Sequence, residues 1–195
     1  MPIDDLVQQA MARWPNVPAM HGWLRLTRRG RWMLIDRGMP GFDEALHGAG
    51  SEITSPPIVD FIGRNYLHDN DGRWYWQNGP QRVFVDLELA PLLYRVMGEA
   101  PTQSLVTHTG YPVMKIDRVM ADADGNLWLL TEQGPGCIDD RDLGAVDMDF
   151  PIDADSDARE TSEPAHGLLR LLGEHRIERL DEPAATRFGF SICPR

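Results

Sequence analysis

A short phrase occurs three times in the chain: a glycine closes a polar turn, and an aromatic-rich stretch follows at once. The glycines are Gly30, Gly72 and Gly125, and each is followed within three residues by a tryptophan. Two of the turns match closely, Asp69-Asn70-Asp71-Gly72 and Asp122-Ala123-Asp124-Gly125. An Asp-Gly turn between strand-like stretches is a strong hairpin signal, because glycine adopts the positive φ that a tight turn requires. The sequence therefore predicts a sheet built from β-hairpins.

The spacing of the three phrases argues against a structural repeat. Their glycines are unequally spaced, and the segments between them differ in sequence. A β-propeller needs at least four blades of four strands each. We therefore interpret the recurrence as shared hairpin chemistry, which carries no function by itself.

Three helices are expected around these strands. The first carries apolar residues at helical spacing, namely Ile3, Leu6, Val7, Ala10, Met11 and Trp14. Ser55-Pro56-Pro57 opens a short second helix, because proline is tolerated in a first helical turn. The third runs from Glu163 to about Leu180 and offers Leu168, Leu171 and Leu172 to the core. Phe188, Phe190 and Ile192 alternate as a final strand.

The fold class predicted from these elements is α+β. We expect one or more mainly antiparallel hairpin sheets with an N-terminal helix, a short middle helix and a C-terminal helix. A chain of 195 residues suits a single domain over residues 1–195, and a division into lobes 1–54 and 55–195 is the alternative. Residues 37–52 are expected to form a surface loop, and the acidic stretch 147–163 a mobile linker.

Charge and composition exclude several classes of function. The net charge of −11 argues against a nucleic-acid surface, which needs clustered cationic residues. The acidic start of the chain and the lack of a long apolar stretch argue against a secretory signal or a membrane span. The two cysteines, Cys137 and Cys193, have no metal-ligand spacing and are interpreted as reduced thiols. Lys115 is the only lysine, so the chain is arginine-rich, as in GC-rich bacteria. We therefore expect a bacterial protein of the cytoplasm.

Several segments together resemble a known family. They are Phe61–Tyr66, Trp74–Glu88, Leu130–Gly134 with Asp139–Leu143, and the ending Arg187–Phe190; the string Gln77-Asn78-Gly79-Pro80-Gln81-Arg82 is the most specific. The sequence resembles a proteobacterial family known only as a domain of unknown function, over nearly the whole chain. The resemblance implies a bacterial, cytoplasmic protein and supplies no catalytic residues.

Polar side chains gather around the turn of the second hairpin. Amides and a guanidinium beside aromatic residues are what a site for a small polar ligand needs, and the arginine fork suits a carboxylate or phosphate. The structural alternative is that the amides bond to the turn while Arg82 pairs with Asp86 or Glu88. The predicted ligand-binding residues are Asn65, Gln77, Asn78, Gln81, Arg82 and His108.

An enzymatic alternative uses His108 as a general base, oriented by Asp86 or Asp139. No serine or cysteine lies in a nucleophile-elbow pattern, so a hydrolase or transferase would have to recruit Thr109 or Cys137 through the fold.

Metal and cofactor sites have little support in the sequence. The best oxygen cluster for a metal is Asp139, Asp140 and Asp142, but the favoured explanation is a helical or turn cap with Arg141 as counter-ion. No nucleotide-binding glycine motif is present, and no cofactor is expected.

The resulting function prediction is a domain that binds a ligand or a protein partner and performs no chemistry of its own. Its partner is either a small polar ligand or another protein, and we expect neither a nucleic acid nor a membrane. The alternatives are the enzyme that uses His108 and an oligomeric structural protein, for instance a homodimer, held together by an exposed apolar patch.

Overall fold

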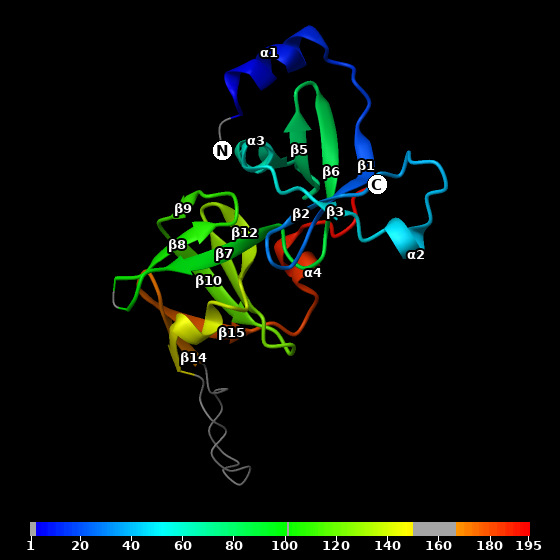
Figure 1. Cartoon of the computed structure of the whole chain (residues 1–195). Coiled ribbons are helices and arrows are strands. Elements are labelled where there is room, and N and C mark those ends of the chain that lie inside the picture. Colours follow the sequence, from blue (N-terminus) through cyan, green and yellow to red (C-terminus); the bar gives the residue numbers. More distant parts are fainter. Residues whose placement is uncertain (1–2, 101, 150–166) are drawn as a thin grey trace.

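Two β-sheets, connected in sequence between residues 87 and 92, make up most of the molecule (Figure 1). The computed structural model describes residues 3–100, 102–149 and 167–195. The first sheet has the strand order β3-β2-β1-β6-β5-β4. Its strands are β1 (Met20–Leu26), β2 (Trp32–Leu34), β3 (Ser51–Glu52), β4 (Tyr66–His68), β5 (Trp74–Asn78) and β6 (Gln81–Leu87).

The second sheet is larger and curls on itself (Figure 1). Its strand order is β13-β14-β15-β10-β11-β12-β7-β8-β9. Its strands are β7 (Leu92–Met97), β8 (Ser104–Thr107), β9 (Pro112–Val113), β10 (Ile116–Ala121), β11 (Leu127–Thr131), β12 (Gly134–Ile138), β13 (Asp147–Asp149), β14 (Gly167–Arg170) and β15 (Glu174–Arg179).

Short helices accompany the sheets: α1 (Asp5–Arg13), α2 (Glu44–His47), α3 (Pro56–Arg64), α4 (Ala184–Phe188) and the 3₁₀ turn η1 (Leu143–Ala145). The expected first and second helices correspond to α1 and α3. Within the expected loop 37–52, however, the chain forms α2 and β3. Asp43 accepts hydrogen bonds from the backbone of Ala45 and Leu46, which caps α2. No helix among the described residues is long and apolar enough to cross a lipid bilayer.

The three glycine turns form as predicted. Gly30, Gly72 and Gly125 all have positive φ, between 71° and 80°. In the two aspartate turns, the first aspartate accepts backbone N–H groups from the residues two and four positions later: Asp69 from Asp71 and Arg73, and Asp122 from Asp124 and Asn126. The same side-chain geometry therefore closes both turns.

The pairing of the strands is mixed, which corrects the expectation of mainly antiparallel sheets in part. The hairpins are antiparallel, but β1 pairs with β6, β10 with β15, and β12 with β7 in parallel. A hairpin pattern fixes only the pairing of strands that follow one another in sequence. The three parallel pairs join strands distant in sequence, and no local pattern specifies them.

The C-terminal elements differ from the prediction. Over the described part of the expected third helix, the chain forms the β14–β15 hairpin, and the leucine spacing that suggested a helix occurs in strands and a turn. Gly173 in that turn has a φ of 120°, a value that a helix does not use. The expected final strand is also wrong, because Phe188 ends α4 and Gly189 caps it in the left-handed region. Phe188 and Phe190 both stack on Trp128 instead.

The two sheets share one hydrophobic core. The lobes 1–54 and 55–195 were the alternative to a single domain; in the structure the strands divide between the two sheets at residues 88–91. Whether 1–195 is a single folding unit stays a prediction. Of the expected acidic linker, residues 147–149 form β13, and residues 150–163 lie outside the described part of the chain.

Candidate functional site

The predicted ligand-binding residues fall into two regions of the structure. Gln77 and Asn78 end β5, and Gln81 and Arg82 begin β6, so these four surround one turn. Gly79 opens the turn with a φ of 55°, as expected for a two-residue hairpin loop. Asn65 follows α3, and His108 lies elsewhere, where the two sheets meet.

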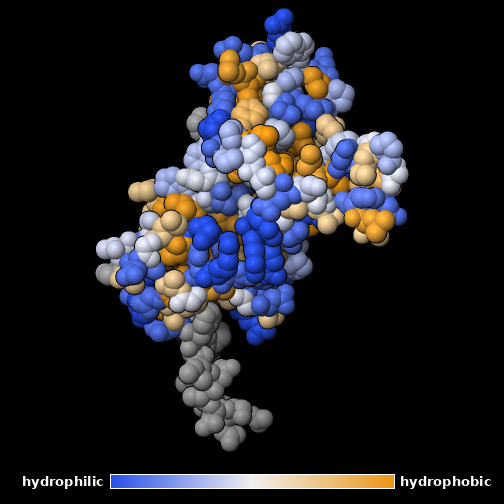
Figure 2. Space-filling view, viewed as in Figure 1, coloured by the Kyte–Doolittle hydropathy of each residue, from blue (hydrophilic) through white to orange (hydrophobic). Residues whose placement is uncertain are grey.

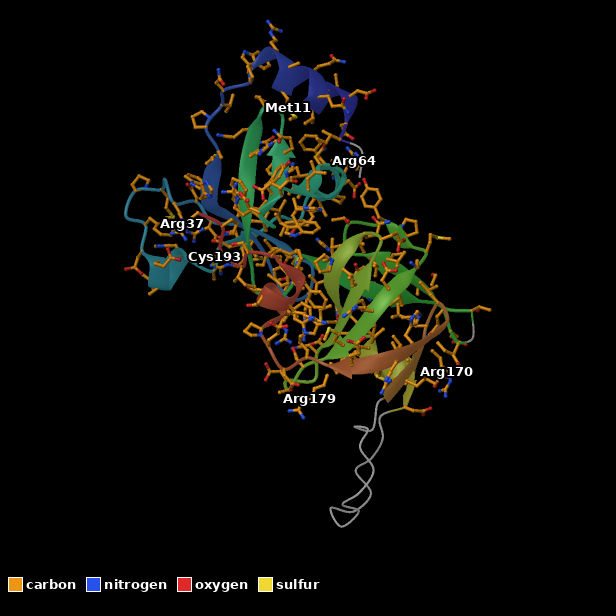
Figure 3. All side chains as sticks on the ribbon, turned by 180° about the vertical axis from the view of Figure 1, so that it is seen from behind. Met11, Arg37, Arg64, Arg170, Arg179 and Cys193 are labelled. Atoms are coloured by element: carbon orange, nitrogen blue, oxygen red, sulfur yellow. The ribbon has the colours of Figure 1, made fainter. Side chains whose placement is uncertain are left out.

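A cavity of about 380 Å³ lies between α1 and this hairpin, and we call it the hairpin pocket. It is lined by Met11, Trp14, Pro15, Val17, Ala19, Gln77, Pro80 and Arg82. Figure 3 shows Met11 between α1 and the tip of the hairpin, and Figure 2 shows hydrophobic side chains exposed at this end of the molecule. The structure thus brings Gln77 and Arg82 together in a largely apolar pocket.

Gln77 is the most constrained polar group of the hairpin pocket. Its side chain is 1% exposed. Its Nε2 donates to the carbonyl of Gly79 at 2.9 Å. That bond fixes the orientation of the amide, because the reversed amide would place two oxygens against each other. The buried Oε1 then has no donor among the described residues. A buried acceptor without a donor is unfavourable by about 1–3 kcal/mol, so it calls for an explanation.

Arg82 supplies the positive charge of the pocket. It pairs with Gln77 across the hairpin, so both side chains lie on one face of the sheet. Its guanidinium lies over the ring of Tyr75, 4.7 Å from the centroid. The structural alternative paired Arg82 with Asp86 or Glu88; among the described residues, Asp86 is instead bound by Arg195, with Nη1 2.8 Å from Oδ1, and Glu88 accepts from the backbone of Arg28. On α1, the guanidinium of Arg13 lies over the ring of Trp14 at 4.8 Å, and Arg13 is not among the described residues that line the pocket.

The other two turn residues, Gln81 and Asn78, lie next to the pocket and are not among the described residues that line it. Gln81 donates to the carbonyl of Pro18 at 3.2 Å, which ties the hairpin to the segment between α1 and β1. Asn78 is exposed at the tip.

Asn65 anchors the start of α1 and does not line the pocket. Its Oδ1 accepts from the backbone of Asp4 at 3.0 Å, and its Nδ2 donates to the Asp4 carboxylate at 3.2 Å. Arg64, at the same end of α1 in Figure 3, also bonds to Asp4. The backbone carbonyl of Asn65 accepts from Gln77 at 2.9 Å, so this residue connects the anchor of α1 to the strand of the pocket.

Sequence reasoning missed the α1 side of the pocket, since it assigned Met11 and Trp14 to a core-facing helix stripe. In the structure only Val7 of α1 is fully buried, Leu6 is 79% exposed and Trp14 is 50% exposed. One signal was available: the apolar stripe ends on a tryptophan directly before Pro15, where the helix must stop.

His108 lies in an aromatic environment between the sheets. Its ring contacts Trp32 and Tyr66, with centroids 5.4 and 5.9 Å apart, and its Nδ1 accepts from the backbone of Leu93 at 3.2 Å. Burial lowers the pKa of His108 from 6.5 to about 3. No carboxylate among the described residues bonds to its ring, and Nε2 is buried without a partner. A general base needs a pKa near the working pH and access to substrate, and this environment favours neither.

The candidate metal ligands are engaged with arginines. Asp139 is 1% exposed and bound by Arg141, whose Nε lies 2.8 Å from Oδ1, and these hydrogen bonds lower the pKa of Asp139 to about 2. Asp142 binds Arg95 at 2.7 Å, and Asp140 lies 3.7 Å from Arg29. Within the part of the chain that the structure describes, no group of three or more ligating side chains is arranged to hold a metal.

Two smaller cavities flank Trp74 and His68 where the sheets meet. The larger, of about 330 Å³, includes Phe188 and Phe190, and the smaller, of about 190 Å³, includes Tyr66 and Glu132. Neither is lined by a buried polar atom that lacks a partner. They give less indication of a ligand than the hairpin pocket does.

Fold and site together define an α+β protein of two mixed sheets with an amphipathic pocket under its first helix. The profile of the family DUF2944, described as "Protein of unknown function (DUF2946)", matches residues 3–195, and the chain belongs to this family. No curated protein matches the chain.

Two solved structures are similar to the chain. A DUF1285 family protein from Silicibacter pomeroyi DSS-3 is 18% identical, with a TM-score of 0.49, over 91% of this chain and 95% of the other. A DUF1285 family protein from Shewanella baltica OS155 is 16% identical, with a TM-score of 0.44, over 63% and 87%.

Proposed function

We propose that the protein is a ligand-binding domain whose site is the hairpin pocket, and that it performs no chemistry of its own. The observation that carries this proposal is the buried Oε1 of Gln77, an acceptor without a donor beside a cavity. A ligand that donates to Oε1 would remove its desolvation penalty on binding. An unsatisfied acceptor in the free protein thus becomes a source of affinity in the complex.

The lining of the pocket supports small-molecule binding. Ligand pockets combine apolar walls with a few placed polar groups, and volumes of roughly 300–1,000 Å³ are usual. The hairpin pocket lies within that range, and its six apolar residues surround two polar ones. The described residues that line it include no histidine, cysteine, serine or carboxylate, so the lining supplies no ordinary acid, base or nucleophile.

The light packing of α1 supports access to the pocket. The helix is fixed near its start by Asp4, while its other end carries the half-exposed Trp14. Few buried contacts mean a low free energy for local opening. Movement of this end would give a ligand a route to the buried Oε1 of Gln77.

A ligand-observed NMR screen tests the proposal. Small carboxylates, phosphates and neutral compounds are screened against the wild type and the Arg82→Gln variant. We expect hits with an anionic group whose saturation transfer is strongly reduced in Arg82→Gln, because the guanidinium is the cation of the pocket. Assigned indole N–H resonances should show Trp14 shifting on titration.

Arg176→Gln is the matched control, since it removes the same charge at an exposed position on β15 in the other sheet. It should retain every hit. Hits equally sensitive to both arginine variants, or a screen without a compound that shifts Trp14, would contradict the proposal.

A further inference from the structure

The positions of Gln77 and Arg82 narrow the chemistry of the ligand, if the hairpin pocket is the binding site as proposed above. The two residues are direct partners across the hairpin. Side chains at such positions start about 5 Å apart and point to the same side. Oε1 of Gln77 and the guanidinium of Arg82 can therefore bind neighbouring groups of a single ligand.

The cation of the pocket suits a carboxylate. A guanidinium fork binds a carboxylate through two parallel hydrogen bonds, and Arg82 is already positioned by the ring of Tyr75. Among the described residues that line the pocket, it is the only charged one. A phosphate monoester carries more charge and more acceptor oxygens than one guanidinium satisfies, so a monocarboxylate fits better.

The group next to the carboxylate must donate a hydrogen bond to Oε1 of Gln77. An ammonium group would meet this need, but it would also bring a positive charge beside Arg82, and the described lining residues include no carboxylate to balance it. A hydroxyl donates to Oε1 without adding charge. A ligand whose hydroxyl lies on the carbon next to its carboxylate meets both requirements, and such a ligand is a 2-hydroxy acid.

The rest of the ligand must be apolar and sizeable. Met11, Trp14, Pro15 and Val17 line the pocket from α1 and the segment that follows it, and Trp14 adds the surface of an indole ring. An aromatic side chain gains most from such a wall, through burial and ring packing. We propose that the hairpin pocket binds a 2-hydroxy monocarboxylate with an aromatic side chain.

Calorimetric titration with four related compounds tests this. 3-Phenyllactate carries all three groups, 3-phenylpropionate lacks the hydroxyl, 3-phenyl-1,2-propanediol lacks the carboxylate, and phenylalanine replaces the hydroxyl with an ammonium. We expect 3-phenyllactate to bind best, and each of the others at least about 10-fold more weakly, the effect of losing one hydrogen bond to a buried or charged group.

Two variants assign each group of the ligand to its residue. Gln77→Met should weaken 3-phenyllactate about 10-fold and leave 3-phenylpropionate unchanged, because only the hydroxy acid uses Oε1. Arg82→Gln should weaken both acids to a similar extent and leave the diol unchanged. Arg176→Gln should change none of the affinities.

The outcomes separate the ligand class from the site. If other compounds shift Trp14 and depend on Arg82 while 3-phenyllactate does not bind, the hydroxy-acid assignment is wrong and the site stands. The assignment also fails if 3-phenylpropionate binds as well as 3-phenyllactate to the wild-type protein, a comparison that needs no variant. If no compound perturbs Trp14, the proposed function fails first.

Discussion

Gln77 and His108 each bury a polar atom that has no partner among the described residues, yet their surroundings differ in kind. Gln77 borders a cavity under a lightly packed helix. His108 is enclosed by the rings of Trp32 and Tyr66, and its other nitrogen is bonded to the backbone of Leu93. An unsatisfied atom beside a cavity can be satisfied by a ligand. One packed among aromatic rings, at a residue that lines none of the cavities described above, is a cost that the surrounding packing must offset.

The comparison separates two roles that look alike in the sequence. Both residues are polar side chains next to strand ends, and both were predicted ligand-binding residues. Substitutions near His108 should therefore lower stability, and substitutions near Gln77 should change binding.

Replacing His108 should have the largest effect on stability. His108→Ala leaves a cavity beside Trp32 and Tyr66 and removes the acceptor of the Leu93 N–H. We expect a loss of about 3 kcal/mol in the free energy of unfolding. Urea denaturation at pH 7 measures it. Ligand binding in the hairpin pocket should be unchanged, and a selective loss of binding in a stably folded variant would place His108 in the site.

Acid should destabilise the protein through His108. The pKa of His108 is about 3 in the folded protein, against an ordinary value of 6.5. Between these two pH values the imidazole is therefore protonated in the unfolded chain and neutral in the folded protein. The free energy of unfolding is therefore not reduced by His108 above pH 6.5, and it decreases as the pH falls from 6.5 toward 3. The expected slope is about 1.4 kcal/mol per pH unit.

His108→Asn is the matched variant, because its side-chain oxygen can replace Nδ1 as an acceptor and does not titrate. Urea unfolding at pH 7 and pH 5 should show the wild type losing about 2 kcal/mol more than this variant. Equal losses in both proteins would mean that His108 is protonated in the folded state.

Gly30→Ala should disturb the same core from the neighbouring turn. A Cβ at Gly30 would lie 2.8 Å from Cβ of His108, at a φ of 72°. Gly125 has a φ of 80° and open space around the same position, so Gly125→Ala measures the cost of the backbone conformation alone. We expect losses of about 2 kcal/mol for Gly30→Ala and about 1 kcal/mol for Gly125→Ala. Equal losses would mean that the contact with His108 relaxes freely.

Local chemistry explains which parts of the fold were predictable. The glycine turns and the helices α1 and α3 follow from glycine conformation, proline placement and spacing, which act over a few residues. The β14–β15 hairpin could not be predicted in this way, because the spacing of Leu168, Leu171 and Leu172 suits a helix as well as a strand followed by a turn. β15 instead pairs in parallel with β10, a contact between segments distant in sequence.

The candidate site was predictable on one side only. Asn78, Gln81 and the pair Gln77 and Arg82 are brought together by one hairpin, which the turn sequence specifies. Trp14 meets them through long-range contacts, among them the bond between Asp4 and Asn65, residues 61 positions apart. Asn65 was selected for its polarity, but its position makes it part of the anchor of α1.

The smallest effect on stability is expected for Gln77→Met. Methionine has a similar volume and removes the buried acceptor that lacks a donor, at the cost of the bond from Nε2 to Gly79. These changes oppose each other, so the free energy of unfolding without ligand should stay within about 0.5 kcal/mol of the wild type. Urea denaturation at pH 7 measures this, with Gln77→Ala as the variant that adds a cavity.

A loss above about 2 kcal/mol for Gln77→Met would show that Oε1 is satisfied in solution, for instance by an ordered water. Gln77 would then have the structural role that we expect of His108. An unchanged free energy of unfolding would show that Gln77 does not stabilise the fold more than methionine does, as expected of a residue whose role is binding.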